Sequence, residues 1–362
     1  MTRQNKAHIF ALLAVLCWST VASAFKLTLR HVDYLTMLLY SSAVSTVFLF
    51  VTLMIQGKAV LLRDSLFAGT GHKREGHSRN PRDTSNTGRK DGRHRAQADS
   101  FRRSAWGRLV NGPLIRSALN GFLNPFLYYV ILFKAYSLLP AQEAQPLNFT
   151  WPIVLVFLSA PMLGQRIRPL SVFALTVSFL GVLIVSTHGD LLGFRFTNLS
   201  GAILAVGSAV VWALFWLTNV RDERDEVLKL FLNFFFGFLY VLAAAIVLGL
   251  ARTTEISTQA AGQAVLSPEG TRATSAAIAS GIAGILGCVY IGIFEMGAAF
   301  VLWLKALQLS EATAKVSNLI FLSPFISLVF IRFIVGERIL PSSIIGLGFI
   351  AAGILIQRTV KG

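Results

Sequence analysis

The sequence has few charged side chains for its length. Of its 362 residues, 14% are Asp, Glu, Lys or Arg and 54% are apolar, whereas a soluble domain has about 25% charged residues. This composition argues against an ordinary soluble enzyme. Basic residues are also concentrated in one segment. Residues 56–113 hold 13 Lys and Arg and 5 Asp and Glu, so this segment carries half of the net charge of +16. We therefore expect no nucleic-acid partner.

Residues that carry catalysis or hold a metal are scarce. The two cysteines, Cys17 and Cys288, both lie in apolar runs, where a thiol is typically a small buried hydrophobic group. The six histidines are scattered. No nucleophile with a base, no paired carboxylates, no metal-ligand spacing and no phosphate-binding glycine loop is found. We expect no catalytic residues, no metal site and no cofactor.

Long apolar runs are what the sequence has in abundance. A helix of about 20 residues crosses a bilayer core. The ten candidate runs cover residues 7–25, 34–55, 114–133, 149–163, 170–187, 199–217, 227–250, 276–304, 319–335 and 344–356. The sequence therefore predicts an all-α membrane protein with ten transmembrane helices.

Basic residues predict the orientation of these helices, because short loops rich in Lys and Arg stay in the cytoplasm. With the N-terminus inside, Arg3, Lys6, residues 56–113 and most basic residues near run ends fall on one side. We expect both termini in the cytoplasm and the protein in the cytoplasmic (inner or plasma) membrane.

The first apolar run has a second interpretation. Lys6, the run itself and the small residues Ala22-Ser23-Ala24 resemble a cleavable signal peptide. An internal match favours a retained helix, because Trp18 follows Ala7 by 11 residues and Trp212 follows Gly201 by the same number.

Two polar segments separate the runs. Residues 56–113 are rich in Gly, Ser, Asn, Arg and Lys, so they bury too little apolar area to offset chain entropy, and we expect disorder. Alternatively, this segment lies on an anionic membrane surface, because Phe101 and Trp106 are flanked by arginines. Residues 251–275 are expected to form a polar loop on the opposite side.

The sequence contains an internal repeat. At an offset of 172, Gly164, Gln165 and Arg166 match Gly336, Glu337 and Arg338, and further matches include Pro169 with Pro341 and Gly181 with Gly353. GFLNPFLYYVILFKA pairs with GIFEMGAAFVLWLKA at an offset of 171. The halves 1–187 and 188–362 thus hold five runs each, and an odd number predicts an inverted repeat, an architecture typical of transporters.

These blocks resemble the drug/metabolite transporter superfamily, in its ten-helix EamA type. The resemblance rests on LLAVLCWSTVASAFK, GAILAVGSAVVWALFW, FEMGAAFVLWLKALQLS and the paired Pro…Gly-Gln/Glu-Arg…Pro…Gly blocks. It implies a central cavity, formed chiefly by the first, third and fourth helices of each half, through which small metabolites such as amino acids pass. The long basic segment 56–113 departs from the usual short loop.

Glu295 is the one acid found deep inside an apolar run. An acid at the centre of a span costs about 2.5–3.5 kcal/mol on insertion scales, so it should face a cavity or a partner. Glu295 precedes Lys305 by ten residues, about 15 Å of helix and half the hydrocarbon thickness. Its repeat partner is Asn124. We predict that Glu295 binds a proton or a substrate amine beside Asn124; the alternative is a fixed contact between helices.

Further residues qualify as cavity groups. Aromatic and amide side chains offer apolar area with a polar group, which suits an organic solute, although they also pack helix cores. The candidates are Trp18, Ser19, Tyr128, Asn148, Trp151, Trp212, Trp216 and Asn318. Pro152 and Pro324 are expected to break helices and free backbone carbonyls. Lys134 and Lys305 are expected to reach the lipid headgroups, with an anion-binding pair as the alternative.

These observations predict a secondary transporter for a small organic metabolite that works by alternating access, with two five-helix halves rocking around a site at mid-depth and coupling protons through Glu295. The partners are the solute and membrane lipids. The alternatives are a passive facilitator or channel, a multidrug or cation exporter, and a membrane enzyme, which would need a catalytic group that the sequence lacks. A monomer and a homodimer both remain open.

Overall fold

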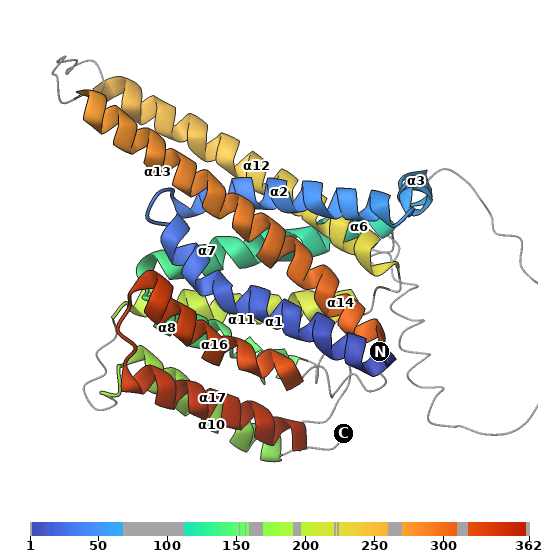
Figure 1. Ribbon diagram of the computed structural model, residues 1–362, viewed down its shortest axis with the longest axis vertical. Helices are drawn as coiled ribbons and strands as arrows, with labels where there is room; N and C mark the ends of the chain where they lie inside the picture. Colours follow the sequence, from blue (N-terminus) through green and yellow to red (C-terminus); the bar gives the residue numbers. More distant parts are fainter. Residues whose placement is uncertain are drawn as a thin grey trace, which may run out of the picture.

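The computed structural model contains helices joined by short turns (Figure 1). It describes residues 2–67, 112–151, 153–155, 157–158, 169–190, 197–220, 222, 224–259, 270–309 and 318–359. Within these ranges every regular element is a helix. The prediction of an all-helical chain is confirmed for the part of the chain that the structure describes.

The elements follow one another along the chain in this order: α1 (Arg3–Thr28), α2 (Tyr34–Ile55), α3 (Ala59–Phe67), α6 (Pro113–Gly121), η1 (Phe122–Leu127), α7 (Tyr128–Leu138), α8 (Ala141–Asn148), α10 (Pro169–Ser186), α11 (Leu199–Val220), α12 (Glu226–Gln259), α13 (Gly270–Tyr290), η2 (Ile291–Ala298), α14 (Ala299–Leu309), η3 (Asn318–Leu322), α16 (Ser323–Phe330), η4 (Ile331–Val335) and α17 (Pro341–Thr359). Five described segments are long and apolar enough to cross a membrane: Arg3–Thr28, Tyr34–Ile55, Leu199–Asn219, Glu226–Gly249 and Ser280–Ala306.

Helix starts follow from local chemistry. The Asp33 carboxylate accepts hydrogen bonds from the backbone N–H groups of Leu35 and Thr36, at 2.9 and 3.1 Å, and so caps α2. Proline begins both α10, at Pro169, and α17, at Pro341. The first helical residue has no intrahelical partner for an N–H, so a proline is tolerated there without loss.

Two polar segments are more helical than expected. The segment 56–113 begins with α3 (Ala59–Phe67), and its residues 68–111 lie outside the described part. The expected loop at 251–275 is shortened, because α12 continues to Gln259 and α13 begins at Gly270. A polar sequence with good helix formers extends a helix beyond its apolar part, which an apolar-run count cannot detect.

Helix interruptions also differ from the expected ones. Pro324 lies in the first turn of α16, after η3, so it begins a helix instead of breaking one. Pro152 lies outside the described residues. An interruption that was not predicted occurs at Asn124, where φ is −148° and ψ is 122°.

The α-helical pattern is interrupted at two matching places, by a kink at Asn124 and by a wide π-helical turn at η2. The segment η1 contains Asn124 and lies between α6 and α7, and the segment η2 contains Glu295 and lies between α13 and α14. These are the two residues that the offset of 171 pairs in the sequence. Single π turns inside α-helices are rare and are frequent at functional sites.

The helices that enclose the centre form two groups. The first bundle consists of α7, α8 and α11, which pack on one another; the second consists of α1, η2, α14 and α16. Helix α1, from the first half of the sequence, thus packs on elements of the second half. The contacts thus exchange α1 and α11 between the halves of the sequence, so neither half packs only on itself.

The molecule has two distinguishable ends in Figure 1. The first turn of α1 and the last turn of α17 lie at one end, which we call the terminal end. The turn between α7 and α8 lies at the opposite end, which we call the turn end, together with the start of α17.

The helices α10 and α17 lie side by side at the edge of the molecule (Figure 1). Glycines allow this close approach: a methyl group added at Gly346 would lie 2.7 Å from the carbonyl oxygen of Gly181 and 2.5 Å from the Cγ2 atom of Val185. By contrast, a methyl group added at Gly348 would meet no atom within 4 Å.

We predict that Gly346→Ala destabilises the protein by about 1–3 kcal/mol, because the added methyl group forces α10 and α17 apart. Gly348→Ala is the matched control and should leave stability unchanged or slightly raised, since alanine favours helix over glycine. Thermal unfolding in detergent measures the difference. Equal melting temperatures for the two variants would contradict the packing argument.

Candidate functional site

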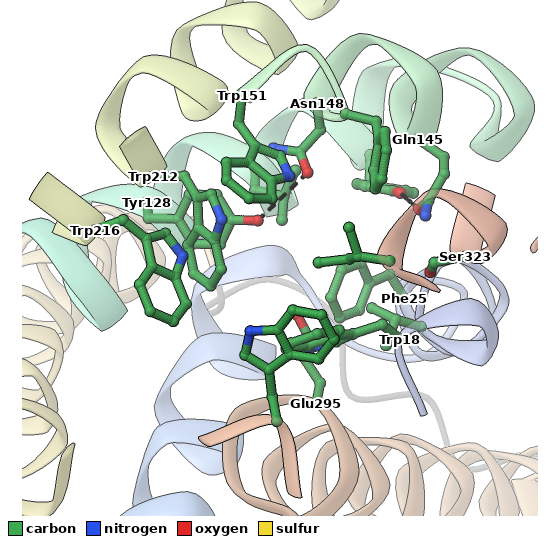
Figure 2. Close-up of a pocket in the computed structure, with 16 residues that line it drawn as sticks. Trp18, Phe25, Tyr128, Gln145, Asn148, Trp151, Trp212, Trp216, Glu295 and Ser323 are labelled. Carbon is green, nitrogen blue, oxygen red and sulfur yellow. Dashed lines mark hydrogen bonds between the residues drawn. The ribbon is translucent and has the colours of Figure 1, made fainter. Parts of the chain in front are cut away.

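A cavity of about 70 Å³ lies between the two bundles. A pocket that encloses a small organic ligand holds roughly 300–1,000 Å³, so a solute bound here would have to push the bundles apart. Figure 2 shows the side chains around it. They are Trp18, Val21, Phe25, Tyr128, Leu132, Tyr136, Gln145, Asn148, Phe149, Trp151, Trp212, Trp216, Glu295, Trp303, Ile320 and Ser323. Both bundles contribute, so a relative movement of the bundles would reshape the cavity.

Tryptophan is concentrated at this cavity. The chain contains six tryptophans, and five of them line it: Trp18, Trp151, Trp212, Trp216 and Trp303. The sixth, Trp106, lies outside the described residues. Indole rings combine a large apolar face with one N–H donor, so this lining suits a flat organic solute.

The rings are held by contacts with one another. The Trp18 ring lies 5.5 Å from that of Trp303 at an interplanar angle of 59°. The Trp212 ring lies 4.6 Å from the Tyr128 ring and 5.9 Å from the Trp216 ring. Such tilted and edge contacts stabilise aromatic pairs beyond their buried area, so the cavity wall is preorganised on both sides.

Glu295 is the acid of the cavity. It is 6% exposed, and its Oε1 accepts a hydrogen bond of 3.1 Å from the hydroxyl of Tyr129. Its Oε2 is buried and has no hydrogen-bond partner among the described residues. The described lining contains no Lys, Arg or His. A cationic group of a bound solute would find one carboxylate in the described lining, that of Glu295 (Figure 2).

The expected pairing of Glu295 with Asn124 is wrong. Asn124 is fully buried, but neither of its side-chain atoms has a hydrogen-bond partner among the described residues, and it does not line the cavity. Its segment, η1, packs against α12. Tyr129, five residues further along, makes the contact with Glu295 instead.

Neutral polar groups lie apart from Glu295 in Figure 2. The Tyr136 hydroxyl donates a hydrogen bond of 2.6 Å to Oε1 of Gln145, so the amide nitrogen of Gln145 is the free end, on the side of Ser323. Asn148 accepts a long bond of 3.4 Å from Tyr128. The Asn148 amide nitrogen donates to the Ser208 hydroxyl at 2.8 Å, so the amide of Gln145 is the main uncharged donor that a solute could use.

The remaining predicted residues lie in different places. Ser19 is buried and bonds to the carbonyl oxygen of Val15 at 2.7 Å, beside the cavity rather than in its lining. Asn318 begins η3, and its side chain lies outside the described part. Lys134 and Lys305 lie over the rings of Tyr34 and Phe10, respectively, and neither lines the cavity. The anion-binding alternative therefore has no support in the cavity geometry.

Several lining residues were not predicted. They include Gln145, Tyr136, Trp303 and Ser323. Tyr129, which donates a hydrogen bond to Glu295 from outside the lining, was not predicted either. Trp303 lies eight residues after Glu295, two helical turns away, and this spacing is a signal that could have found it. Tyr129 had no such signal, because it adjoins Tyr128 and neighbouring residues face different directions on a helix.

The side chains of this arrangement are suited to the recognition of a solute. Aromatic faces attract an apolar or cationic ring system, and one buried carboxylate attracts an amine or a proton. The unpaired Oε2 of Glu295 and the buried, unpaired Nε1 of Trp216 are the polar atoms that a bound solute would satisfy.

Comparison with known proteins agrees with this picture. The model of the EamA-like transporter family matches residues 95–187 and 199–359. A solved crystal structure covers 99% of this chain and 99% of its own, with a TM-score of 0.53 at 17% identity, which shows a shared fold.

Individual relatives cover different parts. The aromatic amino acid exporter YddG of Ancylobacter novellus is 28% identical over 107 residues, which is 29% of this chain and 37% of that protein. An uncharacterized transporter of Clostridium kluyveri is 26% identical over 69% of this chain and 74% of its own. The uncharacterized transporter YvbV of Bacillus subtilis is 24% identical over 67% of this chain and 70% of its own.

We predict that an aromatic amine bound in the cavity changes the intrinsic tryptophan fluorescence saturably, because five tryptophans line it. Titration with phenethylamine of the purified protein measures the change. Trp106→Phe should keep the change, whereas Trp212→Phe should reduce its amplitude. Loss of the signal in Trp106→Phe with full amplitude in Trp212→Phe would show that the ligand binds elsewhere.

Proposed function

Because the chain belongs to the EamA-like transporter family, we propose that it is a secondary transporter that moves a small aromatic, amine-bearing metabolite, amino acids included, across the membrane by alternating access. The observation that carries the proposal is the cavity between the bundles, with five tryptophans around one buried acid, Glu295. The chain is a multi-pass integral membrane protein, in agreement with its five long apolar helices.

Glu295 couples solute to proton in this proposal. A buried carboxylate with one hydrogen bond is costly when charged and unoccupied, so it holds either a proton or an amine. Both cannot occupy the same oxygen atoms. The protein therefore exchanges solute for proton. Either ligand neutralises Glu295, and the bundles change orientation only when one of the two is bound.

Alternating access rests on an inverted repeat of five helices in each half, with ten spans in total. The sequence offsets of 171 and 172 support it, and so do the interruptions of the α-helical pattern at the matching positions Asn124 and Glu295. The exchange of α1 and α11 between the bundles gives each bundle equivalent members of both halves. We propose that the two bundles move about the cavity, with the terminal end in the cytoplasm and the protein in the cytoplasmic membrane.

A second candidate is an exporter of organic cations that lack a carboxylate. The absence of Lys, Arg and His from the described cavity lining favours it, because the carboxylate of an amino acid would find only neutral donors there. The relative named as an aromatic amino acid exporter favours the first candidate. The amide of Gln145 is the group that distinguishes them.

We predict that Glu295→Gln abolishes accumulation driven by a pH gradient in proteoliposomes and weakens binding of tyramine by about 10- to 100-fold, because a charge-assisted hydrogen bond is lost. Uptake of radiolabelled tyramine and tyrosine measures both effects. Glu226→Gln is the matched control, since Glu226 pairs with Lys229 at 2.8 Å and does not line the cavity.

Two outcomes contradict the coupling role. Gradient-driven uptake by the Glu295→Gln protein at the wild-type rate would show that another group carries the proton. A wild-type protein that equilibrates the solute but never accumulates it under a pH gradient would be a passive facilitator.

Tyrosine and tyramine form a matched pair, because they differ only in the carboxylate. If amino acids are carried, Gln145→Leu should weaken transport of tyrosine by about 5-fold or more and leave tyramine nearly unchanged, as expected for one hydrogen bond to a charged group. Competition assays in proteoliposomes measure the ratio. A wild-type protein that carries tyramine and rejects tyrosine would establish the second candidate.

A further inference from the structure

The turn between α7 and α8 brings together two sets of backbone groups that have no partner within their own helices. Helix α7 ends at Leu138, where the last carbonyl oxygens lack intrahelical partners, and α8 begins at Ala141, where the first N–H groups lack them. Partial negative charge collects at the end of α7 and partial positive charge at the start of α8. Groups that pair with this turn must therefore bring both signs of charge.

An acid pairs with the start of α8. Oε1 of Glu337 accepts a hydrogen bond of 2.9 Å from the N–H of Ala141, and Oε2 accepts one of 3.2 Å from the N–H of Gln142. Glu337 lies between η4 and α17, 195 residues or more from its partners in the chain. Hydrogen bonds between a carboxylate and backbone amides are about twice as strong as neutral ones.

A lysine pairs with the end of α7. The Lys26 Nζ atom, on α1, donates to the carbonyl oxygens of Tyr136 and Leu139 at 2.9 and 2.8 Å. Helix α1 belongs to the second bundle, whereas α7 belongs to the first. The bonds of Lys26 thus join the bundles.

Gln142 completes the set. Its Nε2 donates to the carbonyl oxygen of Arg338 at 2.8 Å, and its Oε1 accepts from the N–H of Leu340 at 2.8 Å and from the hydroxyl of Ser343 at 3.1 Å. We call the bonds of Glu337, Lys26 and Gln142 the closing contacts.

The closing contacts lie at the turn end of the cavity. Tyr136 lines the cavity and is also one of the two acceptors of Lys26. Just beside it, the Phe25 ring of α1 packs 4.6 Å from Phe133 and 5.2 Å from Tyr136, which adds an apolar layer between the bundles. Solute that leaves toward the turn end must separate these groups.

We propose that Glu337 and Lys26 are positioning residues that hold the turn end of the transport cavity closed, by pairing with the opposite helix ends at the α7–α8 turn. The proposal rests on the proposed transport function and names the gate of that same cavity. At the repeat position of Glu337 the first half has Gln165, whose amide carries no charge. Of these two repeat-related positions, one therefore has a carboxylate in its side chain.

A distance measurement tests the proposal without any solute. Spin labels at Ser137→Cys, on α7 of the first bundle, and Arg30→Cys, just after α1 of the second bundle, occupy two exposed positions and report the separation of the bundles in lipid nanodiscs. The native Cys17 and Cys288 are replaced by alanine in every sample. Glu337→Gln keeps the size of the side chain but removes its charge, and should increase the long-distance population about fivefold.

Lys26→Met supplies an independent variant with the same expected change, and Glu226→Gln, outside the closing contacts, should leave the distances unaltered. Gel filtration and thermal unfolding establish that each variant is folded. Distance distributions of Glu337→Gln and Lys26→Met that both match the parent would overturn the proposal. Because no solute is present, a failure to transport aromatic amines would leave this result standing and would refute the proposed function alone.

Discussion

One carboxylate enclosed by aromatic rings imposes the main constraint on this molecule. Glu295 lies within the apolar segment Ser280–Ala306, where an uncompensated charge is expensive, and it receives one hydrogen bond, from Tyr129. A protein that needed Glu295 only to hold helices together would satisfy both of its oxygen atoms. Instead, the Oε2 atom has no hydrogen-bond partner among the described residues, and Glu295 lines the cavity. Five tryptophans line the same cavity, and in the proposed function the carboxylate holds either a proton or an amine there.

The exchange of helices between the sequence halves explains how the cavity acquires two different walls. Helix α1 packs on α14 and α16, and α11 packs on α7 and α8. Trp18 and Trp212, which the sequence repeat pairs, therefore stand on opposite walls and both line the cavity. If each half of the sequence packed only on itself, Trp18 and Trp212 would each contact helices of their own half. The observed packing needs close helix contacts elsewhere, and the glycines of α10 and α17 provide them at the edge of the molecule.

The sequence predicts much of this fold and part of the site. Apolar length predicts the helices, and the cost of burying a charge singles out Glu295, because neither argument depends on which way a helix faces. Asn124 was predicted as the partner of Glu295 and Tyr129 was not predicted, for a geometric reason. The backbone at Asn124 is non-helical, so the chain is kinked there and a helix face inferred from regular spacing does not continue through η1. Pro324 was misjudged similarly, since a proline at a helix start and one in its interior look alike in sequence.

A gate at the α7–α8 turn can be held firmly when it is closed and can still be opened. Each helix end there already carries partial charge and has water as an alternative partner once the bundles separate. Opening therefore exchanges bonds to Glu337 and Lys26 for bonds to water, instead of leaving buried groups unpaired. Glu295 has no such alternative, because it lies where aromatic rings surround it. The closing contacts thus lie at helix ends, where water can replace them, and Glu295 lies at the centre, where the proposed function gives it a solute or a proton as its partner.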